Sequence, residues 1–167
     1  MSDCPSTGQL LIWAHMSFNR GDMMKDNAKP RGMLELWIHH KGKLLTYYKS
    51  ENMVVNLGKT CLAHLLGGDT ANRSVTTIAF GTNADGPYPT DDVSAITDIV
   101  TMPVTPSYPD ATSVQFNFSV RVTDMNGMDI RTFGLLTADN TLVCRKTRGI
   151  LIKDSSLSFD GRWTITF

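Results

Sequence analysis

A regular alternation of apolar and polar residues runs through the last eleven positions of the chain, 157–167. Successive side chains of an extended strand point to opposite faces, so this pattern predicts a strand with one buried and one wet face. Chain ends are usually expendable, and an apolar, aromatic end therefore indicates a strand that is paired in a sheet. We expect it to belong to the core or to a contact with a partner. The apolar positions are Leu157, Phe159, Trp163, Ile165 and Phe167.

Similar but shorter patterns recur along the rest of the chain, separated by turn residues. A hairpin is predicted over 33–48 around Lys41-Gly42-Lys43, and a short helix over 57–66, capped by Asn56 and ended by Gly67-Gly68. About eight strands and one helix predict a mainly β fold, an antiparallel β-sandwich or barrel-like module. The other predicted strands are 75–80, 96–104 with Pro103 at an edge or bulge, 114–122, 130–137, 141–145 and 149–152.

Residues 1–32 differ from this pattern because they show no sustained periodicity. They contain clusters with Gly and Pro, which interrupt helices and strands, and one short apolar run, Leu10 to Ala14. We therefore divide the chain into an N-terminal arm or added strand, 1–32, and a β-sandwich domain, 33–167. The arm either adds to the domain's own sheet or docks on a neighbouring copy, and the sequence favours neither.

The charge and the apolar content of the chain indicate which classes of partner to expect. Among 167 residues, 16 are Lys or Arg and 16 are Asp or Glu, so the formal net charge is zero. Strong non-specific attraction to nucleic acid needs a basic surplus, and we expect no nucleic-acid partner. A near-zero charge also does little to oppose self-association. The run at Leu10 to Ala14 is too short to span a bilayer, so we expect no membrane partner.

Residues that often carry chemistry are scattered. The three cysteines, Cys4, Cys61 and Cys144, form no Cys-x-x-Cys pair and are expected to be structural, mostly buried thiols. Neighbours on a strand point apart, so His39 and His40 are expected at a strand end or on the surface rather than on one metal ion. We expect no metal and no cofactor.

Two charged clusters have both a structural and a functional interpretation. Asp85, Asp91 and Asp92 could ligate calcium, but Asp91-Asp92 fits better as the start of a short helix at 93–96. The basic residues Arg145, Lys146 and Arg148 are interpreted as a solvated face, the alternative being bridges to an acidic partner. No nucleophile elbow or phosphate loop is present, and we expect no enzymatic activity.

Three stretches together resemble a group of small structural proteins of tailed-bacteriophage virions, often labelled tail or minor structural proteins. The resemblance covers roughly 33–167 and leaves the N-terminal segment unexplained. It implies a β-rich building block present in many copies, with no catalytic residues to carry over. The stretches are 52–59 leading to 65–68, 75–83 with 89–92, and 133–142 with Arg145, Lys153 and the ending 163–167.

The expected function is therefore that of a structural component of a virion, located in the tail, baseplate or neck and made in the host bacterial cytoplasm. Its expected partners are other copies of itself, as a homo-oligomer, and other virion proteins. The alternatives are a capsid decoration protein, or a receptor- or glycan-binding fibre module with exposed aromatics near Tyr88 and Tyr108. The predicted interface residues are Leu11, Ile12 and Trp13 in the arm, and Trp163, Ile165 and Phe167, as core or interface, at the other end.

Overall fold

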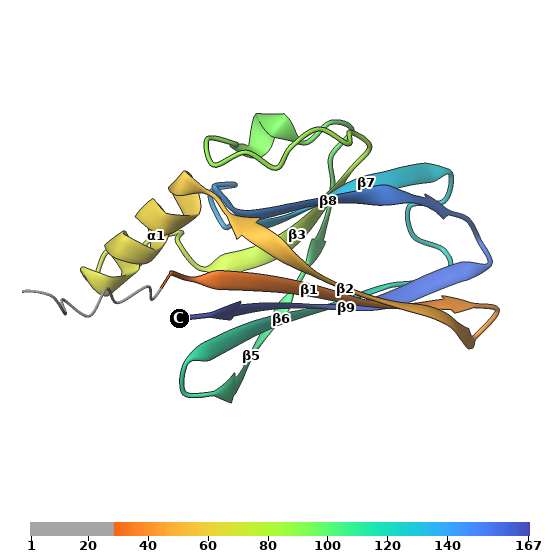
Figure 1. The fold of residues 1–167 in the computed structure, drawn as a ribbon, viewed down its shortest axis with the longest axis horizontal. Helices are drawn as coiled ribbons and strands as arrows, with labels where there is room; N and C mark the ends of the chain where they lie inside the picture. Colours follow the sequence, from red (N-terminus) through yellow and green to blue (C-terminus); the bar gives the residue numbers. More distant parts are fainter. Residues whose placement is uncertain (1–28) are drawn as a thin grey trace, which may run out of the picture.

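The computed structural model describes residues 29–167, which form an antiparallel, nearly closed sheet of nine strands with one α-helix (Figure 1). The predicted fold class is confirmed. The elements are β1 (Arg31–His40), β2 (Lys43–Val54), α1 (Asn56–Leu66), β3 (Val75–Gly81), the 3-10 helix η1 (Val93–Ala95), β4 (Val100–Pro103), β5 (Thr105–Asp110), β6 (Ser113–Val120), β7 (Met128–Thr137), β8 (Leu142–Lys153) and β9 (Leu157–Thr166).

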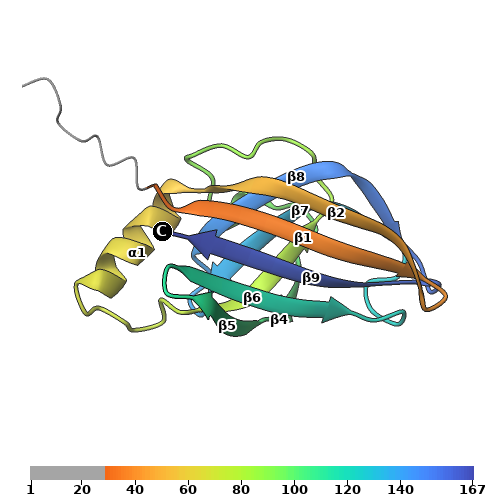
Figure 2. The ribbon, with the colours of Figure 1, turned by 60° about the horizontal axis from the view of Figure 1, so that its bottom comes forward.

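The strand order explains how one sheet encloses the core. It runs β4-β3-β7-β8-β2-β1-β9-β6-β5. β2 pairs with β1 along most of its length but meets β8 only through Met53 and Val54, so the sheet bends sharply there. The two outermost strands, β4 and β5, follow one another in the chain, which brings the two edges together (Figure 2).

The predicted hairpin at the start of the domain is confirmed. Lys41 and Gly42 have φ values of 49° and 78°, the left-handed conformation that a tight turn between β1 and β2 requires. The buried face of β1 consists of Leu34, Leu36 and Ile38. Its opposite face, including Trp37, stays partly exposed.

β9 confirms the prediction that the end of the chain is paired, because it lies between β1 and β6. Trp163 faces Leu34 on one neighbour and Phe116 on the other, and its side chain is fully buried. Gly161 allows this packing, because a Cβ there would lie 2.0 Å from the ring of Phe118.

Aromatic rings fill the centre of the barrel. Phe80 meets Phe118, Phe133 and Phe159 in edge-to-face arrangements, with ring centroids 5.5–6.1 Å apart. Such contacts add about 0.5–1.5 kcal/mol per pair to ordinary apolar burial. The core is therefore assembled from β3, β6, β7 and β9 rather than from adjacent strands alone.

The connection between β3 and β4, residues 82–99, covers the outer face of β3 and β7 (Figure 1). Ile96 packs there against Ala79, Leu136 and Leu142 in a second apolar cluster. The predicted strand over 96–104 is therefore wrong in its first half, since only Val100–Pro103 is a strand. Pro103 lies in an edge strand, as predicted.

Two further predictions need correction. The separate strands expected over 141–145 and 149–152 are one strand, β8, whose pairing with β7 shifts in register rather than breaking. Asn56 does not cap α1. It is the first helical residue, and Val55 occupies the cap position without a side-chain hydrogen bond. The amide of Asn56 instead donates to the carbonyl of Pro89 at 2.8 Å.

Candidate functional site

An exposed apolar surface lies where α1, β5 and the end of β9 meet. Leu66 is 91% exposed, Tyr108 77% and Phe167 54%, although all three are large apolar or aromatic side chains. Leu62 and Leu65 of α1 line the same region and are partly buried. We call these five residues the end surface.

A groove of about 440 Å³ runs beneath the end surface. Its walls come from α1 on one side and from β5 and β6 on the other, and Ile165 and Phe167 of the last strand contribute to its floor and rim. Most of its lining is apolar. Contiguous apolar surface of this kind is typical of places where proteins bind other chains.

α1 is positioned by a close approach to β8. A Cβ on Gly58 would lie only 2.2 Å from the carbonyl oxygen of Val143, so glycine is required at this contact. Cys61, one turn further along, is buried beneath the helix. Only part of the apolar side of α1 faces the core, because Leu57 and Leu66 turn to solvent.

The C-terminus is held beside the groove by the backbone. The amide of Phe167 donates to the carbonyl of Thr112, in the turn between β5 and β6, at 3.0 Å. The side chain of Phe167 projects beyond the last regular pair of β9. The aromatic end of the chain thus has a fixed place at the rim of the groove.

The six predicted interface residues have different locations. Trp163 and Ile165 are core residues, exposed by 0% and 2%, which is one of the two roles predicted for them. Phe167 is exposed on the end surface. Leu11, Ile12 and Trp13 lie outside the described residues, so their contact role stays a prediction.

A charged cluster borders the end surface beyond α1. Arg73 donates to Asp69 through Nε and Nη2, at 3.0 and 2.8 Å, and His64 Nδ1 lies 2.9 Å from the same carboxylate. The hydrogen bond from Arg73, followed by that from His64, lowers the pKa of Asp69.

The Cys61 thiol beneath α1 is not reactive. Burial raises its pKa, so the thiol stays protonated at neutral pH and is a poor nucleophile.

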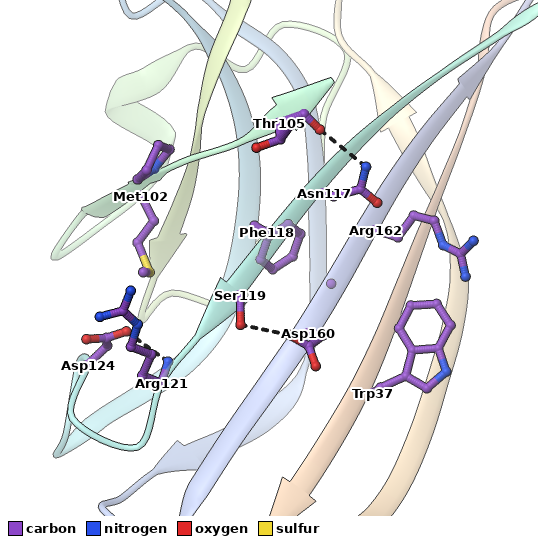
Figure 3. Close-up of a pocket in the computed structure, with 12 residues that line it drawn as sticks. Trp37, Met102, Thr105, Asn117, Phe118, Ser119, Arg121, Asp124, Asp160 and Arg162 are labelled. Carbon is purple, nitrogen blue, oxygen red and sulfur yellow. Dashed lines mark hydrogen bonds between the residues drawn. The ribbon is translucent and has the colours of Figure 1, made fainter. Parts of the chain in front are cut away.

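A second, more polar groove of about 830 Å³ lies at the incomplete closure of the barrel (Figure 3). β5 pairs with β6 only as far as Asn117, so no described strand pairs with residues 118–120 on that edge. The groove runs from this edge to the corner between β4 and β5. Its lining consists of Trp37, Met102, Pro103, Thr105, Asn117, Phe118, Ser119, Arg121, Asp124, Asp160, Gly161 and Arg162.

Trp37 forms one wall of this groove. The guanidinium carbon of Arg162 lies 4.6 Å from the centroid of the indole, and the ring of Tyr47 lies 5.2 Å away on the neighbouring strand. Glu35 accepts a hydrogen bond from Tyr47 and lies 3.5 Å from both Arg162 and Lys49. These contacts hold the aromatic group in a fixed orientation on the outer sheet face.

Two pairs of polar groups in the groove are hydrogen-bonded to one another. Ser119 Oγ donates to Asp160 at 2.7 Å, and Asn117 Nδ2 donates to the Thr105 carbonyl at 3.3 Å (Figure 3). The lining contains carboxylates, guanidinium groups and an amide, but neither histidine nor cysteine. Chemically, such a set is suited to recognition through hydrogen bonds and stacking.

The sequence did not single out this groove. Its polar members lie on the wet faces of strands, where their alternation predicts only exposure. The groove arises because the β4–β5 corner leaves β6 partly unpaired, which is a tertiary feature without a local sequence signal.

The interpretation of Arg145 as part of a solvated face is wrong. Its side chain is fully buried, and Nη1 donates to Asp91 at 2.6 Å while Nη2 donates to the carbonyl of Asp85 at 2.8 Å. Thr147 Oγ1 also donates to the Gly86 carbonyl at 2.8 Å. Arg145 and Thr147 thus hold the 82–99 connection against the sheet, whereas Lys146 and Arg148 contact Ser50 and Tyr48 of β2.

The acidic loop has the structural role that the sequence favoured. Asp92 caps η1, since its side chain accepts from the amide of Ser94 at 2.8 Å. Within residues 29–167, no three His, Cys, Asp or Glu side chains form a group that could hold a metal ion. His39 and His40 end β1, as expected, and the two described cysteines, Cys61 and Cys144, are free and buried.

The aromatic cluster expected of a fibre-tip module is not formed by Tyr88 and Tyr108. Both side chains are exposed, by 56% and 77%. Tyr108 lies in β5, however, whereas Tyr88 lies in the connection that follows β3, and these two elements lie on opposite sides of the molecule (Figure 1).

Comparisons with known proteins identify no relative of the chain, and the resemblance to bacteriophage structural proteins stays a prediction. No family model matches the chain, and searches of curated proteins and of solved structures found no match either. Across residues 29–167, no helix combines the length and the apolar character that crossing a membrane would require.

Proposed function

We propose that this protein is a structural component of a bacteriophage virion, in the tail, baseplate or neck, and that it acts by packing against other copies and other virion proteins. The observation that carries the proposal is the end surface, where leucines and aromatic side chains remain exposed around an apolar groove. Leaving such side chains in water is unfavourable, and burial between subunits recovers about 25 cal/mol per Å².

The rigidity of the surrounding structure supports this role. The groove is built on β9 and β6, two paired strands of the barrel, and on a helix fixed by the contact of Gly58 with β8. A surface on rigid elements loses little conformational entropy on association. The balanced charge of the chain does not oppose contact between copies.

Analysis of intact particles tests the proposal. Mass spectrometry of purified particles of the virus that encodes the chain should detect the protein in stoichiometric amounts, and gold-labelled antibodies should mark the tail, baseplate or neck. Labelling over the whole shell would favour the capsid-decoration alternative. Absence of the protein from washed particles would contradict a virion role altogether.

A receptor- or glycan-binding module is the second candidate, and the groove at the barrel closure favours it. Trp37 beside carboxylate, guanidinium and amide groups is a combination that binds polar ligands with a flat apolar face, such as sugars. Binding to a glycan array that disappears in Trp37→Ala would support this candidate. If the intact protein binds no glycan on the array, this result would count against the glycan-binding candidate.

A further inference from the structure

The apolar groove beneath the end surface has the properties of a binding site for a short apolar peptide. Leu62, Leu65, Phe116, Val143, Ile165 and Phe167 contribute to its lining. Together with the neighbouring hollow between α1 and Phe167, it offers apolar contact along the second half of α1, from Cys61 to Leu66.

The described chain begins next to this groove. Arg31, the first residue of β1, pairs with Thr166, and Phe167 follows directly at the rim. Residues 1–28 precede this point and lie outside the described structure. The segment that joins them to the domain therefore starts beside the groove rather than at the distant β1–β2 turn.

The N-terminal segment contains one stretch that matches the groove chemically. Leu10-Leu11-Ile12-Trp13-Ala14 is an uninterrupted apolar run in an otherwise mainly polar segment. Residues 15–30 connect it to β1, and in an extended conformation they span up to roughly 50 Å. That reach includes the groove of the same chain and that of an adjoining copy.

The edge strand beside the groove favours insertion of side chains over addition of a strand. β5 is the outermost strand and contains Pro106 and Pro109, which have no N–H to donate. Pairing along this edge would leave backbone groups of an incoming strand unsatisfied. Apolar side chains, in contrast, find a ready-made apolar lining.

We propose that the groove between α1 and the β5–β6 hairpin binds the segment Leu10 to Ala14 of this protein, with Trp13 as its main anchor. Trp buries the largest apolar surface of the five residues and typically dominates such contacts. The inference deepens the proposed function, because a segment supplied by a neighbouring copy would be one of its intersubunit contacts.

Disulfide trapping in the full-length chain tests this proposal. Ala14→Cys, which leaves the Trp13 anchor intact, is combined with Leu65→Cys or, separately, with Leu66→Cys, in a background of Cys4→Ser and Cys61→Ala, and the protein is mildly oxidised. Rapid cross-linking is expected, either within the chain as a faster-migrating monomer or between chains as a covalent dimer. Both products place the segment in the groove, and they identify the chain that donates it.

Leu44→Cys is the matched control, because Leu44 is also an exposed leucine but lies in the β1–β2 hairpin at the opposite end of the molecule (Figure 1). Ala14→Cys with Leu44→Cys should cross-link at least tenfold more slowly. Equal rates at both ends, or no cross-link at either groove position, would overturn the proposal.

The same samples separate this inference from the proposed function. Multimers in sedimentation without a groove cross-link would refute the segment's docking and leave assembly standing. An intrachain cross-link in a protein that stays monomeric would support the docking and contradict assembly through this surface.

Discussion

At the scale of single residues, the buried pair of Arg145 and Asp91 has a large predicted effect on the stability of the fold. Arg145→Met leaves the Asp91 carboxylate buried without its partner, and we expect a loss of about 3–5 kcal/mol in the free energy of unfolding. Urea unfolding of the variant and of the unchanged protein measures this loss. Adding Asp91→Asn should restore much of the loss, because the uncompensated charge is then gone.

Lys49→Met is the control for this prediction. Lys49 forms an ion pair with Glu35 at 3.5 Å, but its side chain is half exposed, so its removal should cost no more than about 1 kcal/mol. Similar losses for Arg145→Met and Lys49→Met would contradict the role assigned to the buried pair.

Gly161 gives a second prediction at this scale. Gly161→Ala forces a methyl group against the ring of Phe118, and we expect it to destabilise the protein by about 1–3 kcal/mol. Phe118→Leu in the same chain should relieve part of the clash. Gly149→Ala, where nothing lies within 4 Å of the added Cβ, should change stability by less than about 0.5 kcal/mol.

Residue-level prediction from the sequence succeeded where a local pattern decides burial. The alternation over 157–167 correctly predicted that Trp163 and Ile165 point inward, because the side-chain period of a strand is fixed. Prediction from the sequence failed for Arg145, because its partner Asp91 lies 54 residues away in the chain. A buried charge is tolerated only through its tertiary contacts, and those have no signature in the neighbouring residues.

At the scale of elements, β9 is the strand on which the barrel depends most. Removing residues 163–167 leaves residues 31–34 of β1 and 113–116 of β6 without their partner in β9 and opens the core at Trp163. We expect the truncated chain to lose soluble, cooperative folding, as judged by expression and by thermal melting followed by circular dichroism. A truncated protein with unchanged melting would contradict this assignment.

Point variants on the same strand refine the test. Trp163→Ala should destabilise the protein by about 3–5 kcal/mol, since it leaves a cavity in the core. Thr164→Ala is the control, because Thr164 is only partly buried and faces outward, where it accepts one hydrogen bond from Gln115.

Elements were predictable where strong turn signals bounded them. Lys41-Gly42 and Gly67-Gly68 marked the hairpin and the end of α1 correctly, because left-handed backbone favours glycine. The limits of β4 and the continuity of β8 were not predictable. Ile96 is apolar because it packs on the outer face of the sheet, and a local pattern cannot distinguish this from a strand.

At the scale of the whole molecule, aspartate side chains in the turns make the stability of the fold depend on pH in the acidic range. Hydrogen bonds from nearby Ser and Thr groups lower the pKa of Asp92, Asp110, Asp139 and Asp154 below the ordinary value of 3.8. A lowered pKa in the folded state stabilises the fold at pH values above 3.8, and this contribution is lost as the pH falls below that value.

We therefore expect the urea midpoint to be constant near neutrality and to decline below about pH 4. Asp154→Ala should make the decline shallower, because this carboxylate no longer accepts from the amides of Ser156 and Leu157. A midpoint that rises on acidification would contradict the sign of these pKa shifts.

The central claim concerns contacts between copies, and sedimentation velocity over a range of concentrations tests it most directly. The intact protein should form concentration-dependent multimers, and Leu66→Glu with Phe167→Glu should keep it monomeric. Leu44→Glu with Leu45→Glu, two exposed leucines in the β1–β2 hairpin, should leave the multimers unchanged. A protein that is monomeric at every concentration, or two variants that behave alike, would contradict assembly through the end surface.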